Sequence, residues 1–101
     1  MRRASLDFEG FFDVRQTTDD AQAAQMTLSP GQSTGGPDNR HADSDQWLYV
    51  VSGSGRATVD GEDVRFEAGA LLVIEAGETH EIENDGEEPL ETLNLYVPPI
   101  Y

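Results

Sequence analysis

Short segments in which apolar and polar residues alternate, separated by turns rich in Gly, Pro and Asp, run through most of this 101-residue chain. Residues 46–51 (QWLYVV) have the strongest strand pattern because they are rich in aromatic and β-branched side chains. Further strands are expected at residues 24–28, 56–59, 64–66, 70–74, 79–83 and 90–97, with a hairpin turn at Asp60-Gly61. Short strands at this spacing predict an all-β sandwich or barrel.

Three stretches have a less regular pattern. An aromatic cluster over residues 8–14 is expected in a strand or an extended arm. Residues 19–25 could cap and start a helix, but the alternation of Ala24, Met26 and Leu28 with polar neighbours favours a strand. Residues 30–38, which are rich in Gly, Ser and Pro, are expected to form a loop.

The two faces of the strand at residues 46–51 differ in their expected surroundings. Gln46 shares a face with Leu48 and Val50, which have the character of core residues, so Gln46 is expected beside a pocket. Trp47 and Tyr49 point to the opposite face. An apolar outer face indicates burial against a second sheet or a partner chain.

Composition narrows the classes of protein to which the chain can belong. The absence of cysteine excludes disulfides and thiolate metal sites. No apolar run approaches the roughly 20 residues that span a bilayer. The basic start Met1-Arg2-Arg3 is not followed by an apolar stretch, so a signal peptide is not expected. We therefore expect a cytoplasmic protein.

The chain is strongly acidic, with 20 Asp and Glu against 6 Lys and Arg, and a formal net charge of −14. Such a charge should repel nucleic acids and anionic membranes. Two interpretations of it stay open. The acidic residues either form an ordinary solvated surface or mark a halophilic protein, because salt screens the mutual repulsion of the charges.

The segment at residues 69–84, GALLVIEAGETHEIEN, contains the most informative histidine. His80, Ile82 and Asn84 alternate along an expected strand, so they share a face, and His80 is expected to point into a cavity. This segment resembles the second motif of the cupin superfamily, G-x5-P-x-G-x2-H-x3-N. It matches at Gly69, Gly77, His80 and Asn84 and carries Glu75 in place of the proline.

The first cupin motif, G-x5-H-x-H-x(3,4)-E-x6-G, is recognisable in a degraded form when it is anchored at Gly53. Its glutamate then falls on Gln46, its second histidine on His41 and its first histidine on Asn39. The resemblance covers residues 26–96 and implies a small jelly-roll barrel of two antiparallel sheets. We expect one domain over residues 1–101, with a core at about 24–97, an N-terminal strand or arm at 1–20 and an apolar tail at 98–101. The tail either folds over the domain or reaches a neighbour, and the resemblance implies a homodimer.

Cupin pockets usually hold one divalent metal on three histidines and a glutamate. The matching positions here are Asn39, His41, Gln46 and His80, which are the expected ligand pocket and the expected metal ligands. Imidazole suits Zn, Fe, Ni or Mn, but without the anionic glutamate the ion should be weakly held. Nearby loop acids, Asp43 and Asp45, could supply the missing charge, although such acids are usually solvated. Asn84 precedes Asp85-Gly86 and has the character of a turn residue.

These residues leave the function open between classes. One hypothesis is a metal-dependent enzyme of unknown reaction, in which the ion acts as a Lewis acid; without a metal, His41 or His80 would act as general base. The alternative is a metal-free module that binds or senses a small polar molecule or a sugar, because carboxamides hydrogen-bond hydroxyl groups well. A third is a filled barrel with a structural or storage role.

Overall fold

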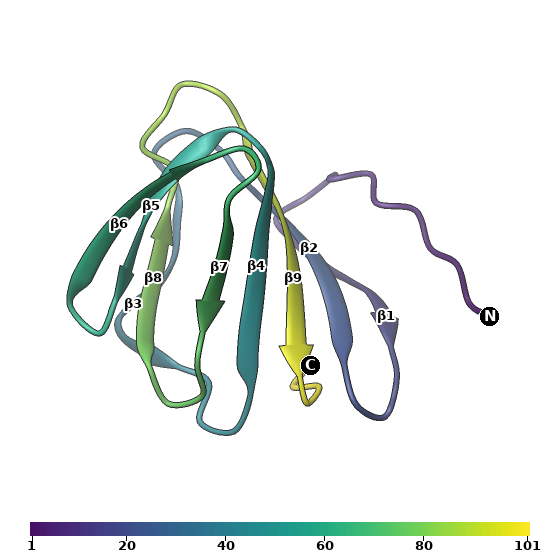
Figure 1. Ribbon diagram of the computed structural model, residues 1–101. Helices are drawn as coiled ribbons and strands as arrows, with labels where there is room; N and C mark the ends of the chain where they lie inside the picture. The colour runs from purple at the N-terminus through teal and green to yellow at the C-terminus, as the bar shows by residue number, and fades with distance from the viewer.

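Two antiparallel sheets packed face to face make up the computed structural model of the chain, which describes all residues except the side chains of 37–40 (Figure 1). Within the described residues, one sheet has five strands in the order β1-β2-β9-β4-β7 and the other has four in the order β3-β8-β5-β6. The strands are β1 (Phe12–Thr17), β2 (Gln22–Leu28), β3 (Ser33–Arg40), β4 (Asp45–Ser52), β5 (Ser54–Val59), β6 (Glu62–Glu67), β7 (Leu71–Ile74), β8 (Thr79–Glu83) and β9 (Leu90–Val97). The predicted all-β class is confirmed, and no helix in the described chain is long and apolar enough to cross a membrane.

Most expected strands are present, and one expectation is wrong. Residues 33–40 form β3 instead of part of a loop, and β3 pairs with β8, with Ser33 opposite Glu83 and Thr34 opposite Ile82. Local composition predicted a loop because Gly, Ser and Pro disfavour strands in isolation, but the hydrogen-bonding edge of β8 provides a partner. The register shifts after Gly35, whose φ of 82° lies in the left-handed region that glycine accepts readily.

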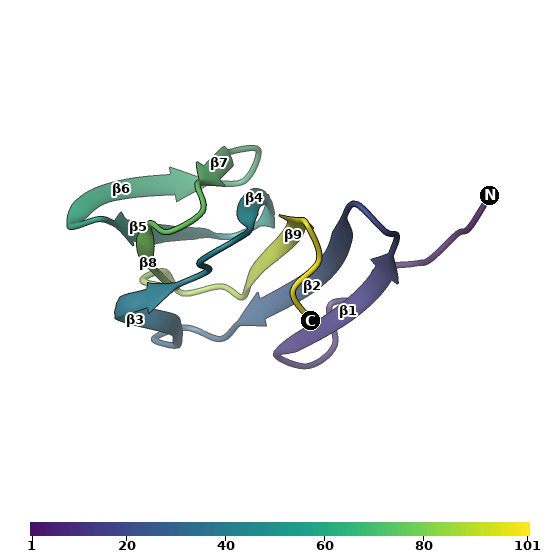
Figure 2. The same cartoon turned by 90° about the horizontal axis from the view of Figure 1, so that it is seen from below.

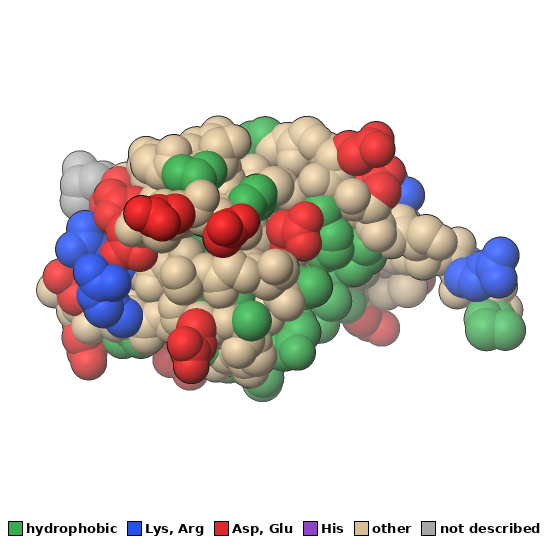
Figure 3. Space-filling view, turned by 90° about the horizontal axis from the view of Figure 1, so that it is seen from above, with side chains coloured by type: hydrophobic (Ala, Val, Ile, Leu, Met, Phe, Trp, Pro, Cys, Tyr) green, Lys and Arg blue, Asp and Glu red, His purple; other side chains and the backbone are tan. Residues whose placement is uncertain are grey.

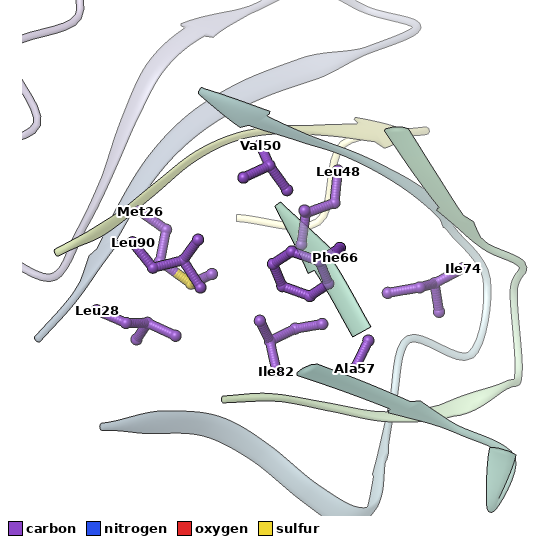
Figure 4. Packing of buried hydrophobic residues seen from close by; sticks show 9 residues of the cluster. All are labelled: Met26, Leu28, Leu48, Val50, Ala57, Phe66, Ile74, Ile82 and Leu90. Carbon is purple, nitrogen blue, oxygen red and sulfur yellow. The ribbon is translucent and has the colours of Figure 1, made fainter. Parts of the chain in front are cut away.

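The hydrophobic core lies between the two sheets (Figure 4). Every buried leucine or isoleucine contributes about 1.5–3 kcal/mol of transfer free energy, so this cluster dominates the stability of the fold. Its members come from both sheets and are Met26, Leu28, Leu48, Val50, Ala57, Phe66, Ile74, Ile82 and Leu90.

Polar side chains occupy the same inward faces at the other end of the barrel, which is the lower end in Figure 1. There Gln46 at the start of β4 and His80 at the start of β8 are both 4% exposed, one inward position away from Leu48 and Ile82. Tyr96 comes from the end of β9 and is 3% exposed. The inward-facing positions of these strands are therefore apolar in the core and polar at the end where the cavity lies.

The outer face of the five-stranded sheet is apolar. Trp47, Tyr49, Leu71, Val73 and Leu95 are 41%, 43%, 58%, 44% and 39% exposed. They are neighbours across β9, β4 and β7, because Trp47 lies opposite both Val73 and Leu95. The space-filling view shows hydrophobic side chains gathered along one side of the molecule, while acidic side chains are scattered over the surface facing the viewer (Figure 3).

Residues 98–101, which we call the 98–101 segment, fold back across the polar end of the barrel (Figure 2). The buried side chain of Gln22 holds this segment: its Oε1 accepts hydrogen bonds from the backbone N–H of Ile100 (3.2 Å) and of Tyr101 (2.8 Å). Its Nε2 donates to the backbone oxygen of Tyr101 (2.8 Å). The Ser44 hydroxyl donates to the Pro98 carbonyl at 2.7 Å. The apolar tail thus packs on its own domain.

Candidate functional site

A cavity of about 240 Å³ at the polar end of the barrel brings together three of the four predicted site residues, His41, Gln46 and His80. The fourth, Asn39, lies outside the residues whose side chains are described. Other described residues that line the cavity are Phe11, Phe12, Met26, Thr34, Gly35, Ile82, Tyr96 and Tyr101.

The two histidines form a close pair although they are far apart in sequence. Their ring centroids are 4.9 Å apart, with the ring planes tilted by 49°. Burial lowers the pKa of both imidazoles. For His80 the nearby Glu78 carbonyl opposes this effect, while the neighbouring His41 lowers the pKa further. Both rings are therefore mainly neutral at pH 7, and a neutral imidazole carries one hydrogen-bond donor and one acceptor. Nδ1 of His80 lies 3.5 Å from the Glu78 carbonyl oxygen.

A chain of carboxamides fixes how Gln46 is oriented in the cavity wall. The Ala24 carbonyl can only accept a hydrogen bond, so the Asn94 atom beside it, at 3.5 Å, is the donor Nδ2. Asn94 Nδ2 also donates to Thr92 Oγ1 at 3.0 Å. Asn94 Oδ1 is then left to accept from Gln46 Nε2 at 3.0 Å. Asn94 and Thr92 are fully buried. The remaining atom of the Gln46 amide, its Oε1, therefore cannot exchange places with the nitrogen.

The oxygen of Gln46 is a buried acceptor that no described side chain or backbone group satisfies with good geometry. The His41 ring lies near enough for this oxygen to raise the pKa of His41 in part, although burial lowers that pKa by more. A buried acceptor left unpaired costs about 1–3 kcal/mol, so a donor that enters the cavity recovers this energy.

Aromatic rings form the rest of the wall in a connected series. Centroid distances are 4.9 Å between Phe12 and Tyr101, 5.1 Å between Tyr101 and Tyr96, and 5.5 Å between Tyr96 and His41. Burial, together with the Tyr101 hydroxyl, raises the pKa of Tyr96 far above its usual value, so this phenol stays neutral. The sequence analysis did not assign Tyr96 or Tyr101 to the site. The signal that could have found Tyr96 is its position on β9, which alternates in phase with Asn94.

Other polar residues near the motifs have structural roles. Asn84 is fully buried, and its amide donates to the carbonyls of Leu28 (2.9 Å) and Glu88 (2.8 Å), so it is the turn residue that the sequence predicted. Asp45 accepts a hydrogen bond from the Ala76 N–H at 2.8 Å and does not line the cavity. Asp43 is exposed.

The donor set fits a weakly held divalent ion. Within the described part of the chain, no group of three His, Asp or Glu side chains is close enough to hold a metal. Two neutral imidazoles with ring centroids 4.9 Å apart and the unpaired Gln46 oxygen could together supply three neutral ligands. A structural or catalytic site of high affinity normally adds an anionic ligand, which these three residues do not provide.

Comparisons with known proteins agree with this architecture. A family profile described as a cupin domain matches residues 24–96. The tetracenomycin polyketide synthase protein TcmJ of Streptomyces glaucescens is 40% identical over 64 residues, which are 63% of this chain and 42% of that protein. An oxalate-binding protein of Thermotoga maritima is 35% identical over 74 residues, which are 73% of this chain and 60% of that protein. The chain thus spans less than two thirds of the length of both relatives.

A crystal structure of a Bacillus halodurans protein superposes with a TM-score of 0.84 at 24% identity, covering 90% of this chain and 72% of that one. This likeness shows the shared fold, and the predicted jelly-roll barrel is confirmed. Because the profile spans well over half of the sequence, the chain belongs to the cupin family.

Proposed function

We propose that this cupin binds a small polar molecule in the cavity formed by His41, Gln46 and His80. The observation that carries the proposal is the convergence of these three side chains, from three segments of the chain, on one cavity of about 240 Å³. At roughly 30 Å³ per water molecule, that volume corresponds to about eight waters, enough for a compact metabolite.

The chemistry of the wall favours an uncharged ligand that both donates and accepts hydrogen bonds. A neutral imidazole carries one donor and one acceptor, and the Gln46 oxygen is an acceptor. If the protein is an enzyme that works without a metal, a neutral His41 or His80 is its candidate general base. The name of one relative, an oxalate-binding protein, makes oxalate a reasonable comparison compound.

A thermal-shift experiment tests binding. The melting temperature is measured with oxalate, glucose and 2-naphthol as separate probes, for the wild type, His80→Ala and the control variant Gln25→Ala. A ligand present at one hundred times its Kd adds about 2.7 kcal/mol to the free energy of unfolding. We expect at least one probe to raise the melting temperature of the wild type and of Gln25→Ala but not of His80→Ala. The absence of a shift with all three probes would contradict the proposal.

A second candidate is a divalent ion held by His41, His80 and Gln46, which the spacing of the two imidazoles favours. When bound, such an ion would act as a Lewis acid on a carbonyl or enolate oxygen of the ligand. The residues would contribute two neutral nitrogens and one carboxamide oxygen, while the aromatic wall would exclude water from the bound molecule.

The substitution Gln46→Glu tests the metal candidate, because it adds the anionic ligand that the set lacks. We expect elemental analysis after dialysis against Zn²⁺ to find more bound metal in Gln46→Glu than in the wild type, and less in His80→Ala. Equal metal content in all three proteins would refute a site at these residues.

We also propose that the apolar outer face of the five-stranded sheet pairs with the same face of a second copy. Trp47, Tyr49, Leu71, Val73 and Leu95 are uncharged neighbours on a chain whose net charge is −14, so this face lets two copies approach without placing carboxylates against each other. A stable interface needs about 800 Å² from each partner. The halophilic and cytoplasmic character of the protein, and its organisation as one domain over residues 1–101, stay predictions.

A further inference from the structure

We propose that the ligand is a planar ring that carries a hydroxyl group, a phenol or an enol, and that this hydroxyl donates to Gln46 Oε1. The proposal rests on the proposed function, since it names the class of molecule that the same cavity binds. Two independent observations carry it: the fixed orientation of the Gln46 amide and the series of aromatic rings beside it.

The orientation of Gln46 selects a hydrogen-bond donor. Its Nε2 is committed to Asn94 Oδ1, and Asn94 is itself locked by the Ala24 carbonyl. Gln46 lines the cavity, and the second atom of its amide is a buried carbonyl oxygen, which can accept but never donate. A carboxylate or ether oxygen placed against it meets a like partial charge, whereas a hydroxyl hydrogen satisfies it.

The aromatic wall selects a flat body for the ligand. Phe12, Tyr101, Tyr96 and His41 lie in contact at centroid distances of 4.9–5.5 Å, so part of the cavity surface consists of ring faces and edges. Planar rings pack against such groups in offset or edge-to-face arrangements. A cavity of about 150 Å³ is known to accept benzene, so about 240 Å³ accommodates one substituted ring or two fused rings.

Burial of the cavity wall favours an un-ionised hydroxyl as the form that binds. His80 and Tyr96 are only 4% and 3% exposed, so the wall is largely shielded from water. The same desolvation acts on any ionisable ligand that enters. The bound hydroxyl therefore keeps its proton, and this proton is the one that Gln46 Oε1 requires.

Four related compounds test each part of this inference at pH 7 in the presence of EDTA, which removes any metal-mediated binding. They are 2-naphthol, its methyl ether 2-methoxynaphthalene, its anionic analogue 2-naphthoate and its saturated analogue decahydro-2-naphthol. Binding is measured by isothermal titration calorimetry. We expect 2-naphthol to bind at least about tenfold more tightly than each of the other three, because each analogue lacks the donor, the neutrality or the flat ring.

The variant Gln46→Met removes the acceptor at nearly constant volume and should reduce the preference for 2-naphthol over its methyl ether about tenfold. Gln25→Met is the matched control: Gln25 is also a buried glutamine, 1% exposed, but it bonds to Asp7 outside the cavity, so the preference should persist. Far-UV circular dichroism checks that both variants fold. The wild-type panel does not depend on either variant.

The outcomes separate this inference from the proposed function. If 2-naphthoate, 2-methoxynaphthalene or decahydro-2-naphthol binds as tightly as 2-naphthol, the assignment of a planar hydroxyl donor is wrong, while a small-molecule site remains. If oxalate or glucose binds and 2-naphthol does not, the ligand class is likewise wrong. If none of these compounds binds, both the inference and the proposed function fail.

Discussion

Replacing Gln22 by alanine should open the cavity without unfolding the protein. The Gln22 side chain makes three hydrogen bonds to the backbone of Ile100 and Tyr101 and a fourth to Thr17 Oγ1, at 3.0 Å. Tyr101 lines the cavity and contacts Phe12 and Tyr96, so the 98–101 segment covers part of the site. Loss of its anchor should let this segment detach more often.

The structure sets the size of the effect. Three hydrogen bonds at about 0.5–1.5 kcal/mol each sum to about 1.5–4.5 kcal/mol. Because Tyr101 is 61% exposed, water replaces part of this energy, and we expect a value near the lower end, about 2 kcal/mol. At 1.4 kcal/mol for each factor of ten, the detached population should rise about 30-fold.

Modification of the histidines by diethyl pyrocarbonate measures this population. The chain has two histidines, both in the cavity wall, and mass spectrometry of the peptides separates His80 from His41. His80 is 4% exposed, so its modification rate should follow detachment and rise by tens of fold in Gln22→Ala. Urea unfolding measured in parallel reports any general loss of stability.

Gln25→Ala is the control, since it removes a buried glutamine from the same strand, whose side chain instead bonds to Asp7 in the N-terminal arm. It should leave the His80 rate unchanged. Two results would refute the reasoning: an unchanged rate in Gln22→Ala, or equal increases in both variants, which would indicate opening of the whole barrel.

Three further predictions concern association, salt and pH. Trp47→Glu should convert a dimer to a monomer in sedimentation equilibrium, whereas Val64→Glu, at an equally exposed position of the other sheet, should leave the dimer intact. A wild type that is monomeric at all concentrations would contradict the proposed interface. The melting temperature should rise with KCl, because salt screens the repulsion among the acidic side chains: the Debye length falls from about 10 Å at 0.1 M to about 3 Å at 1 M. A melting temperature that does not change with KCl would argue against a halophilic role for the net charge of −14. The pKa of Tyr96 is raised in the folded state, so above pH 10 only the unfolded state loses this proton. The free energy of unfolding of the wild type should therefore fall with pH more steeply than that of Tyr96→Phe, by about 1.4 kcal/mol per pH unit. Equal pH slopes for the two proteins in urea titrations would show that Tyr96 titrates normally.

The strands that could be predicted from sequence are those whose own residues prefer the extended state. Residues 90–97 were predicted with the observed bounds, and the predicted positions of Leu48 and Val50 in the core are confirmed by their complete burial. β3 was missed because its stability comes from its partner β8, whose paired residues are 39 to 50 positions away in the sequence. Strand propensity depends only on the residues of the segment itself, whereas the presence of a partner strand depends on the whole fold.

The candidate site was predictable only where a spaced motif marked it. His80, His41 and Gln46 were found from motif positions, and they meet in one cavity. Tyr101 was missed because its place depends on Gln22, a residue without any motif that holds the 98–101 segment through backbone contacts. Backbone contacts leave no pattern of residue types, so a single sequence does not reveal them.

The buried carboxamides also determine which way β9 faces. This strand is apolar on both sides, because Leu93 and Leu95 point outward while Leu90 and Tyr96 point inward. A slip by one residue would exchange the two sides at little hydrophobic cost. The same slip would also move Asn94 to the surface. The buried amide of Gln46 would then lose its hydrogen-bond partner. The hydrogen-bonded pair of Gln46 and Asn94 thus determines the register of β9. Hydrophobicity alone cannot do so, because β9 has apolar side chains on both faces.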